Sequence, residues 1–181
     1  MVVVICSIVI LYMVAEQRLN ELPAAAERAN FYALLEQIKT GINFEMITHV
    51  ASGNFSGLTQ LEGANPMNFL LDKPRNYRGE LELVTDRNTT RRSWYYETST
   101  GELVYVVGGP SIEDVFVTIA GIPVNLGQIR FRMVNVIDGH VTGNDAGSAG
   151  NLPDRSRWQG LQLVPVREFE WERREEVPVE I

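Results

Sequence analysis

The amino-acid sequence predicts an α+β fold, in which one long N-terminal helix packs on an antiparallel β-sheet head. The first 50 residues combine an uncharged apolar run with a following segment whose apolar residues recur at spacings of three and four. From residue 79 onward, apolar residues recur instead at every second position, which is typical of half-buried strands. We therefore divide the chain into a helix over residues 1–50 and a β-rich head over residues 51–181.

The apolar run at the start of the chain (MVVVICSIVILYMVA) predicts a helix whose first part is embedded in a membrane. As a helix the run extends about 22 Å at 1.5 Å per residue, whereas the hydrocarbon core of a bilayer is about 30 Å thick. A cleaved signal peptide would begin with a basic region, which this run lacks. We therefore expect the run to stay attached as a single-pass anchor, and the recorded start to lie inside a longer reading frame. The residues expected in the membrane are Val2, Val3, Val4, Ile5, Ile8, Val9, Ile10, Leu11 and Val14.

The segment after the run continues the helix with an amphipathic pattern and without a turn signal. Pro23 lacks a helical N–H and crowds the preceding turn, which predicts a kink just outside the membrane. The polar face of the helix is expected to contain Glu27, Arg28, Glu36 and Lys39. The residues predicted to pack the helix on the sheet are Phe31, Leu34, Leu35, Ile38 and Ile42.

The head is predicted from alternating apolar residues separated by turn signals. Residues 51–73 are rich in glycine, asparagine and serine, and they predict an irregular connector. The sequence SWYYETSTGELVYVVG predicts a hairpin in which Gly101 has a positive φ. Arg130 and Arg132 fall on one face of their strand, which is expected to be in water. Strands are predicted over residues 79–86, 93–97, 102–107, 115–120, 128–136 and 161–171.

The composition argues against nucleic-acid binding and against catalysis. The formal net charge is -7, and the sequence has no basic stripe of the kind that displaces counterions from phosphates. The histidines His49 and His140 and the single cysteine Cys6 provide almost no material for a nucleophile–histidine arrangement or a cysteine-based zinc site. We therefore expect no enzymatic activity, no cofactor, no nucleic-acid partner and no small-molecule substrate.

A glycine-rich loop over residues 139–158 supports an alternative interpretation. The loop and its flank bring together oxygen-bearing side chains, which calcium favours as ligands. The same residue types are those that turns prefer, and their spacing matches no EF-hand. The alternative is a single-pass membrane-anchored module that binds a ligand or calcium through this loop. The oxygen-bearing residues are Asp138, Asn144, Asp145, Asn151 and Asp154.

Two segments of the sequence resemble type IV pilins and type II secretion pseudopilins. The segment MVVVICSIVILYMVAEQRLNELPAAAERANFYALLEQIKTGINFEM is similar to the later part of the family's N-terminal helix, which passes from apolar to amphipathic without a break. The segment SWYYETSTGELVYVV is similar to the sheet hairpin of minor pilins of the mannose-sensitive haemagglutinin (MSHA) type. The family's processing motif, a glycine followed by an aromatic residue and a nearby glutamate, does not precede the apolar run, which agrees with a longer reading frame.

The resemblance implies a pilin-like, non-enzymatic structural or assembly subunit, a minor pilin or pseudopilin, of a type IV pilus or a type II secretion-like filament. It implies a single-pass location in the bacterial inner membrane, with the head in the periplasm, and incorporation into a surface filament. The partners implied are the membrane and other pilin or pseudopilin subunits. Residues Val2 to Val14 would anchor the subunit and then pack against neighbouring helices in the filament.

Overall fold

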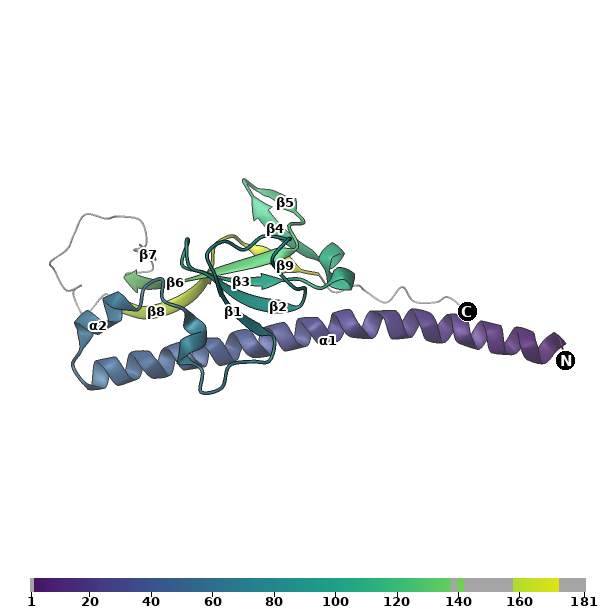
Figure 1. Cartoon of the computed structure of the whole chain (residues 1–181), viewed down its shortest axis with the longest axis horizontal. Helices are drawn as coiled ribbons and strands as arrows, with labels where there is room; N and C mark the ends of the chain where they lie inside the picture. Colours follow the sequence, from purple (N-terminus) through teal and green to yellow (C-terminus); the bar gives the residue numbers. More distant parts are fainter. Residues whose placement is uncertain (1, 138–139, 142–157, 173–181) are drawn as a thin grey trace.

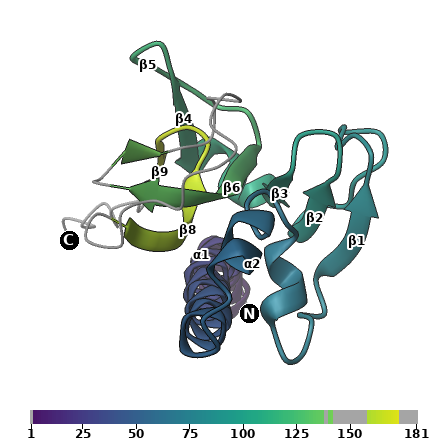
Figure 2. The same ribbon diagram turned by 90° about the vertical axis from the view of Figure 1, so that its left-hand side faces the viewer.

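The computed structural model of the chain describes residues 2–137, 140–141 and 158–172. Only the backbone is described for residues 2–22, 55–56, 59, 110, 137, 140–141 and 158–159. One long helix lies beneath two sheets (Figures 1 and 2). The helices are α1 (Val2–Ala51) and α2 (Phe55–Gln60), with the 3₁₀ helices η1 (Pro66–Phe69) and η2 (Gly109–Asp114). The strands are β1 (Tyr77–Leu81), β2 (Ser93–Glu97), β3 (Glu102–Val106), β4 (Val115–Ile119), β5 (Ile122–Val124), β6 (Gln128–Ile137), β7 (His140–Val141), β8 (Trp158–Pro165) and β9 (Phe169–Trp171).

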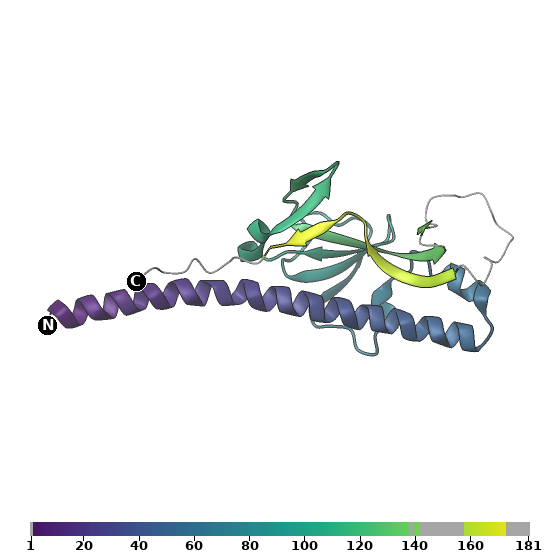
Figure 3. The ribbon, with the colours of Figure 1, turned by 180° about the vertical axis from the view of Figure 1, so that it is seen from behind.

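Helix α1 is continuous from Val2 to Ala51 and includes Pro23. Its axis curves gently and shows no sharp bend (Figures 1 and 3). The prediction of one uninterrupted N-terminal helix is confirmed, and the proline predicted to kink the helix does not break it. The C-terminal half of α1 lies along the sheets, whereas the N-terminal half extends beyond them (Figures 1 and 3).

The strands of the described residues form a six-stranded sheet and a three-stranded sheet. The order in the first is β1-β2-β3-β6-β7, with β8 also paired to β6, and the order in the second is β5-β4-β9. The pairs are antiparallel except that of β1 with β2, which is parallel. The predicted antiparallel sheet is therefore wrong at this edge. Residues 82–92 provide the long return that a parallel pair requires.

The second sheet was not predicted, because the strand expected over residues 161–171 is two strands. β8 pairs with β6 as far as Pro165, after which residues 166–168 redirect the chain and β9 pairs with β4. The connector predicted to be irregular likewise contains α2 and η1. The side chains of Asn54 and Asn65 cap these two helices by accepting a hydrogen bond from a backbone N–H of the first turn.

The predicted hairpin is confirmed as β2 and β3, with Glu97 opposite Glu102 and Gly101 at a φ of 68°. The predictions for β4 and β6 are also confirmed to within one residue at each end. β1 ends at Leu81, earlier than predicted, because the following segment leaves the sheet. There the backbone N–H of Val84 donates to the side-chain carboxylate of Glu97 at 2.7 Å and not to the backbone of a neighbouring strand.

The main core lies between α1 and the inner face of the six-stranded sheet (Figure 2). The side chains that β6 contributes to it are Ile129, Phe131 and Met133. A second apolar cluster covers part of the outer face of the sheet and consists of Val84, Tyr95, Val104 and Val106, with Leu81 packed against it. The face that carries Arg130 and Arg132 is therefore partly covered, and the expectation that it is in water holds only in part, since both arginine side chains are partly exposed.

Candidate functional site: the helix–head interface

The five helix residues predicted to pack on the sheet lie in the main core, between α1 and the head. Their spacing of three and four positions places them on one face of the helix. Fully burying one such side chain contributes about 1.5–3 kcal/mol, so this face is the main attachment of α1 to the head. The five residues are Phe31, Leu34, Leu35, Ile38 and Ile42, each at most 6% exposed.

Phe31 lies where the helix meets both sheets. Its ring stacks on that of Trp94 in β2, with the centroids 5.4 Å apart and the planes at 5°. It also contacts the ring of Trp171 in β9, at a centroid distance of 5.0 Å. Such aromatic pairs contribute about 0.5–1.5 kcal/mol beyond the area that they bury. Phe31 therefore joins the six-stranded and the three-stranded sheet to α1.

The prediction that Glu27 belongs to a polar face of the helix is wrong. Its side chain is buried against the head, at 7% exposure. Glu27 precedes Phe31 by four positions, and residues at this spacing lie on the same face of a helix. The spacing to the apolar stripe was therefore the signal in the sequence that could have identified Glu27 as a buried residue.

Four donors from the head surround the Glu27 carboxylate. Its Oε1 accepts hydrogen bonds from the Tyr105 hydroxyl at 2.9 Å and from the Gly108 backbone N–H at 2.6 Å. Its Oε2 accepts hydrogen bonds from the Ser111 hydroxyl at 2.8 Å and from Nε of Arg92 at 3.1 Å. We call these five residues the Glu27 cage. A buried carboxylate needs such donors, because an unpaired charge in a protein interior is strongly unfavourable.

Two features of the head allow these contacts with the Glu27 carboxylate. Burial raises the pKa of the Tyr105 phenol, and the charge of the Glu27 carboxylate raises this pKa further. Tyr105 therefore stays protonated and donates a hydrogen bond to the carboxylate. Gly108 allows the backbone to approach the helix, since a Cβ atom at this position would overlap Oε2 of Glu27. Any side chain at position 108 is therefore incompatible with the cage.

A second network of buried charges lies on the outer face of the sheet. Arg130 in β6 contacts the carboxylates of Glu97 at 2.6 Å and Glu102 at 2.9 Å, and Arg132 contacts Glu102 at 2.7 Å. The two glutamates are buried, whereas 30% of the Arg130 side chain is exposed. The register of β3 and β6 places Glu102 directly opposite Arg132, so this ion pair is a cross-strand pair, whereas Arg130 reaches across β3 to Glu97 in β2.

The pKa of the Glu97 carboxyl lies below its ordinary value. Burial alone would raise this pKa, but hydrogen bonds donated by the Arg130 guanidinium, the Val84 backbone N–H and the Thr100 hydroxyl outweigh the effect of burial. The folded chain therefore releases the Glu97 proton at a lower pH than the unfolded chain does. This difference links the stability of the head to pH.

We expect the head to lose stability in acid in part through Glu97. Its carboxylate stabilises the folded state fully above the unfolded pKa of about 4.3, and the contribution disappears as the pH falls through the lower, folded pKa. Glu97→Gln is expected to be less stable than the wild type at pH 7 and to approach it between about pH 5 and 3. Urea denaturation at each pH measures this difference. A constant difference across the range would show that the carboxylate charge is not responsible.

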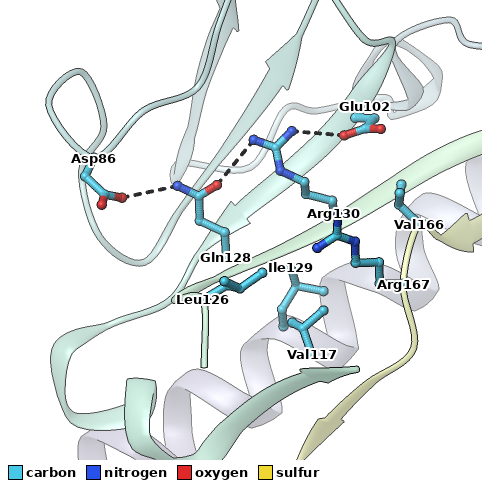
Figure 4. Close-up of a pocket in the computed structure, with 9 residues that line it drawn as sticks. All are labelled: Asp86, Glu102, Val117, Leu126, Gln128, Ile129, Arg130, Val166 and Arg167. Carbon is cyan, nitrogen blue, oxygen red and sulfur yellow. Dashed lines mark hydrogen bonds and ion pairs between the residues drawn. The ribbon is translucent and has the colours of Figure 1, made fainter. Parts of the chain in front are cut away.

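A cleft of about 400 Å³ opens beside the outer-face network (Figure 4). A chain of side-chain hydrogen bonds crosses it from Asp86 through Gln128 and Arg130 to Glu102. The apolar residues that line the cleft are Val117, Leu126, Ile129 and Val166. Because the Arg130 guanidinium is engaged by two carboxylates, these polar groups satisfy one another, which is typical of a structural network.

Two sets of predicted site residues lie outside what the structure describes. The membrane residues from Val2 to Val14 belong to the segment for which only the backbone is described, and most of the loop predicted as an alternative calcium site, residues 142–157, is not described. Within the described residues, no helix combines the length and the apolar character needed to cross a bilayer. Within the same residues, no group of three or more histidine, cysteine, aspartate or glutamate side chains is placed to hold a metal ion.

Comparisons with models of protein families, with curated proteins and with solved structures find no match to this chain. The resemblance to type IV pilins and pseudopilins therefore rests on the two sequence segments alone. The helix–head interface, with Phe31 and the Glu27 cage at its centre, is the candidate functional site.

Proposed function

We propose that the chain is a non-enzymatic assembly subunit, a minor pilin or pseudopilin, of a type IV pilus or a type II secretion-like filament. The observation that carries the proposal is the continuous 50-residue α1, whose C-terminal half packs on the head. The other half extends beyond the sheets (Figure 3) and carries the uncharged apolar run. A head of this size needs no helix that projects so far, so the projecting half serves contacts outside the head.

The apolar run gives those outside contacts their chemistry. Before assembly, Val2 to Val14 hold the subunit in the bacterial inner membrane, with the head in the periplasm. During assembly the same side chains exchange lipid for neighbouring helices, because packing and not the hydrophobic effect drives helix association in a bilayer. The partners are then the membrane and other subunits of the filament.

The helix–head interface supports an assembly role. An assembled filament transmits force from subunit to subunit, so the head must be attached rigidly to the helix that anchors it. The buried stripe from Phe31 to Ile42 and the Glu27 cage provide such an attachment from two chemically different kinds of contact. These contacts leave the outward face of the helix for neighbours, with Phe44 at 71% and Ile47 at 60% exposure.

We expect the full chain to sediment with membranes. Adding a thiol oxidant to those membranes is expected to form a disulfide cross-link between the Cys6 residues of two copies, since Cys6 is the single cysteine. Val9→Arg is expected to release the chain and abolish the cross-link, because an arginine at the centre of an inserted helix costs about 2.5–3.5 kcal/mol. Membrane fractionation and non-reducing electrophoresis measure both effects.

Val9→Leu is the matched control, since it preserves the apolar character of the run and should leave both results unchanged. Cys6→Ser should keep the membrane location and lose only the cross-link. A wild-type chain that stays in the soluble fraction, or a Val9→Arg variant that still sediments with membranes, would contradict the proposed anchor.

A further inference from the structure

We propose that Glu27 fixes the register of α1 on the head, and thereby sets how far the apolar run projects from it. This inference rests on the proposed function for its biological meaning, but its physical content concerns the helix–head interface alone. The cage places one carboxylate of the helix among four donors that all belong to the head. Such a contact is directional, whereas the apolar contacts around it are not.

The apolar stripe defines the position along the helix axis only in part. A shift of one turn would place Ile38 where Leu34 was and Ile42 where Ile38 was, but it would also place Lys39 where Leu35 was. Exchanges between leucine and isoleucine are tolerated in cores with modest loss of stability. Within the stripe, Phe31 resists such a shift through its ring contacts, and Leu35 resists it because a lysine would take its buried place.

Glu27 excludes the shifted positions. One helical turn moves a side chain by about 5.4 Å along the axis, which is beyond the reach of a hydrogen bond. The residues one turn away on the same face are Pro23 and Phe31, neither of which has a side chain that can accept the four donors. A shifted helix would therefore bury an unpaired carboxylate and leave the donors of the cage without an acceptor.

The donors come from separate segments of the head, which makes the position strict. Arg92 precedes β2, Tyr105 lies in β3, and Gly108 and Ser111 lie at and near the start of η2. Because these segments are fixed relative to one another by the sheet, the carboxylate meets all four donors at one axial position and one rotation of α1. Buried polar groups elsewhere are best known for this role of specifying register.

The test measures distances between spin labels on the helix and the head, in the full chain with Cys6→Ser. Labels at Asn30 and Ser99 form one pair, and labels at Asn30 and Ile122 form a second pair, since all three residues are exposed. We expect one narrow distance distribution in each pair for the parent chain. Glu27→Met removes the charge but keeps the length, and it should give a second population shifted by about 5 Å in at least one pair.

Two controls separate a register role from a general loss of packing. Glu27→Gln retains one oxygen acceptor in the same place and should keep the narrow distribution. Glu36→Met removes an exposed carboxylate from the same helix, one that pairs with Lys39 at 2.7 Å, and should also leave the distribution narrow. Circular dichroism of the buried aromatic side chains establishes that each variant is folded.

A folded Glu27→Met variant with the parental distribution in both pairs would overturn the proposal. If Glu27→Met does not fold, Tyr105→Phe combined with Ser111→Ala decides the question, because it removes two donors and keeps the carboxylate. Broadened distances in that variant support the proposal, and unchanged distances overturn it. Failure of the membrane cross-link would leave these distances unaffected, so the two proposals fail separately.

Discussion

Phe31→Ala is expected to reduce the free energy of unfolding of the head by about 3–5 kcal/mol, the range found for deleting a buried phenylalanine side chain. The ring is 1% exposed and contacts aromatic residues of both sheets, so its removal leaves a cavity where the two sheets and α1 meet. A loss of this size is a large part of the stability of a typical domain. Urea denaturation, followed by tryptophan fluorescence, measures it.

Phe44→Ala is the matched control for this experiment. Phe44 is an aromatic residue of the same helix but is 71% exposed, and its replacement is expected to change the free energy of unfolding by less than about 0.5 kcal/mol. The comparison separates the effect of burial on stability from the effect of helix propensity, because both variants replace a phenylalanine of α1 by alanine. Equal losses in the two variants would mean that α1 does not pack on the head through the face that carries Phe31.

Arg130→Met is expected to reduce the free energy of unfolding by about 2–3 kcal/mol at pH 7, less than the about 3–5 kcal/mol for breaking a fully buried ion pair, because the arginine is partly exposed. The substitution leaves the buried carboxylates of Glu97 and Glu102 with fewer partners. Without the guanidinium, the pKa of Glu97 in the folded state rises, so the folded variant takes up a proton at a higher pH than the folded wild type does. The loss should therefore shrink as the pH falls toward about 4.

Urea denaturation at pH 7 and at lower pH values checks both parts of this expectation. Lys39→Met is the control, since Lys39 and Glu36 form an exposed ion pair at 2.7 Å that contributes at most about 0.5 kcal/mol. Its effect should be small and should not depend on pH in this range. A loss in Arg130→Met that grows in acid would contradict the assignment of a charge-stabilising role to Arg130.

The features that could be predicted from the sequence are those determined by neighbouring residues. The continuous helix follows from a periodic apolar pattern without a turn signal, and the hairpin follows from Gly101 between two runs of alternating residues. The parallel pairing of β1 with β2 and the change of sheet after Pro165 could not be predicted in this way. They depend on which distant strand offers a free edge, and a local pattern contains no information on that choice.

Glu27 illustrates the same limit at the level of one side chain. Its position one turn before Phe31 indicates a buried side chain, but a carboxylate is usually exposed. Whether Glu27 is buried therefore depends on the hydrogen-bond donors that the head provides. Those partners, Tyr105, Gly108 and Ser111, lie 78, 81 and 84 positions further along the chain. Arg130 was likewise predicted to be in water, because the glutamates that pair with it belong to other strands.

The contact between Phe31 and Trp171 has a consequence for the order in which the chain acquires its structure. A helix forms from local contacts within about a microsecond, whereas contacts between distant residues form slowly and only once both are present. Synthesis proceeds from the N-terminus, so α1 is complete before the strand that contains Trp171 exists. Until then the apolar face of the helix lacks its contact with the three-stranded sheet, so the part of that face around Phe31 is completed only at the end of synthesis.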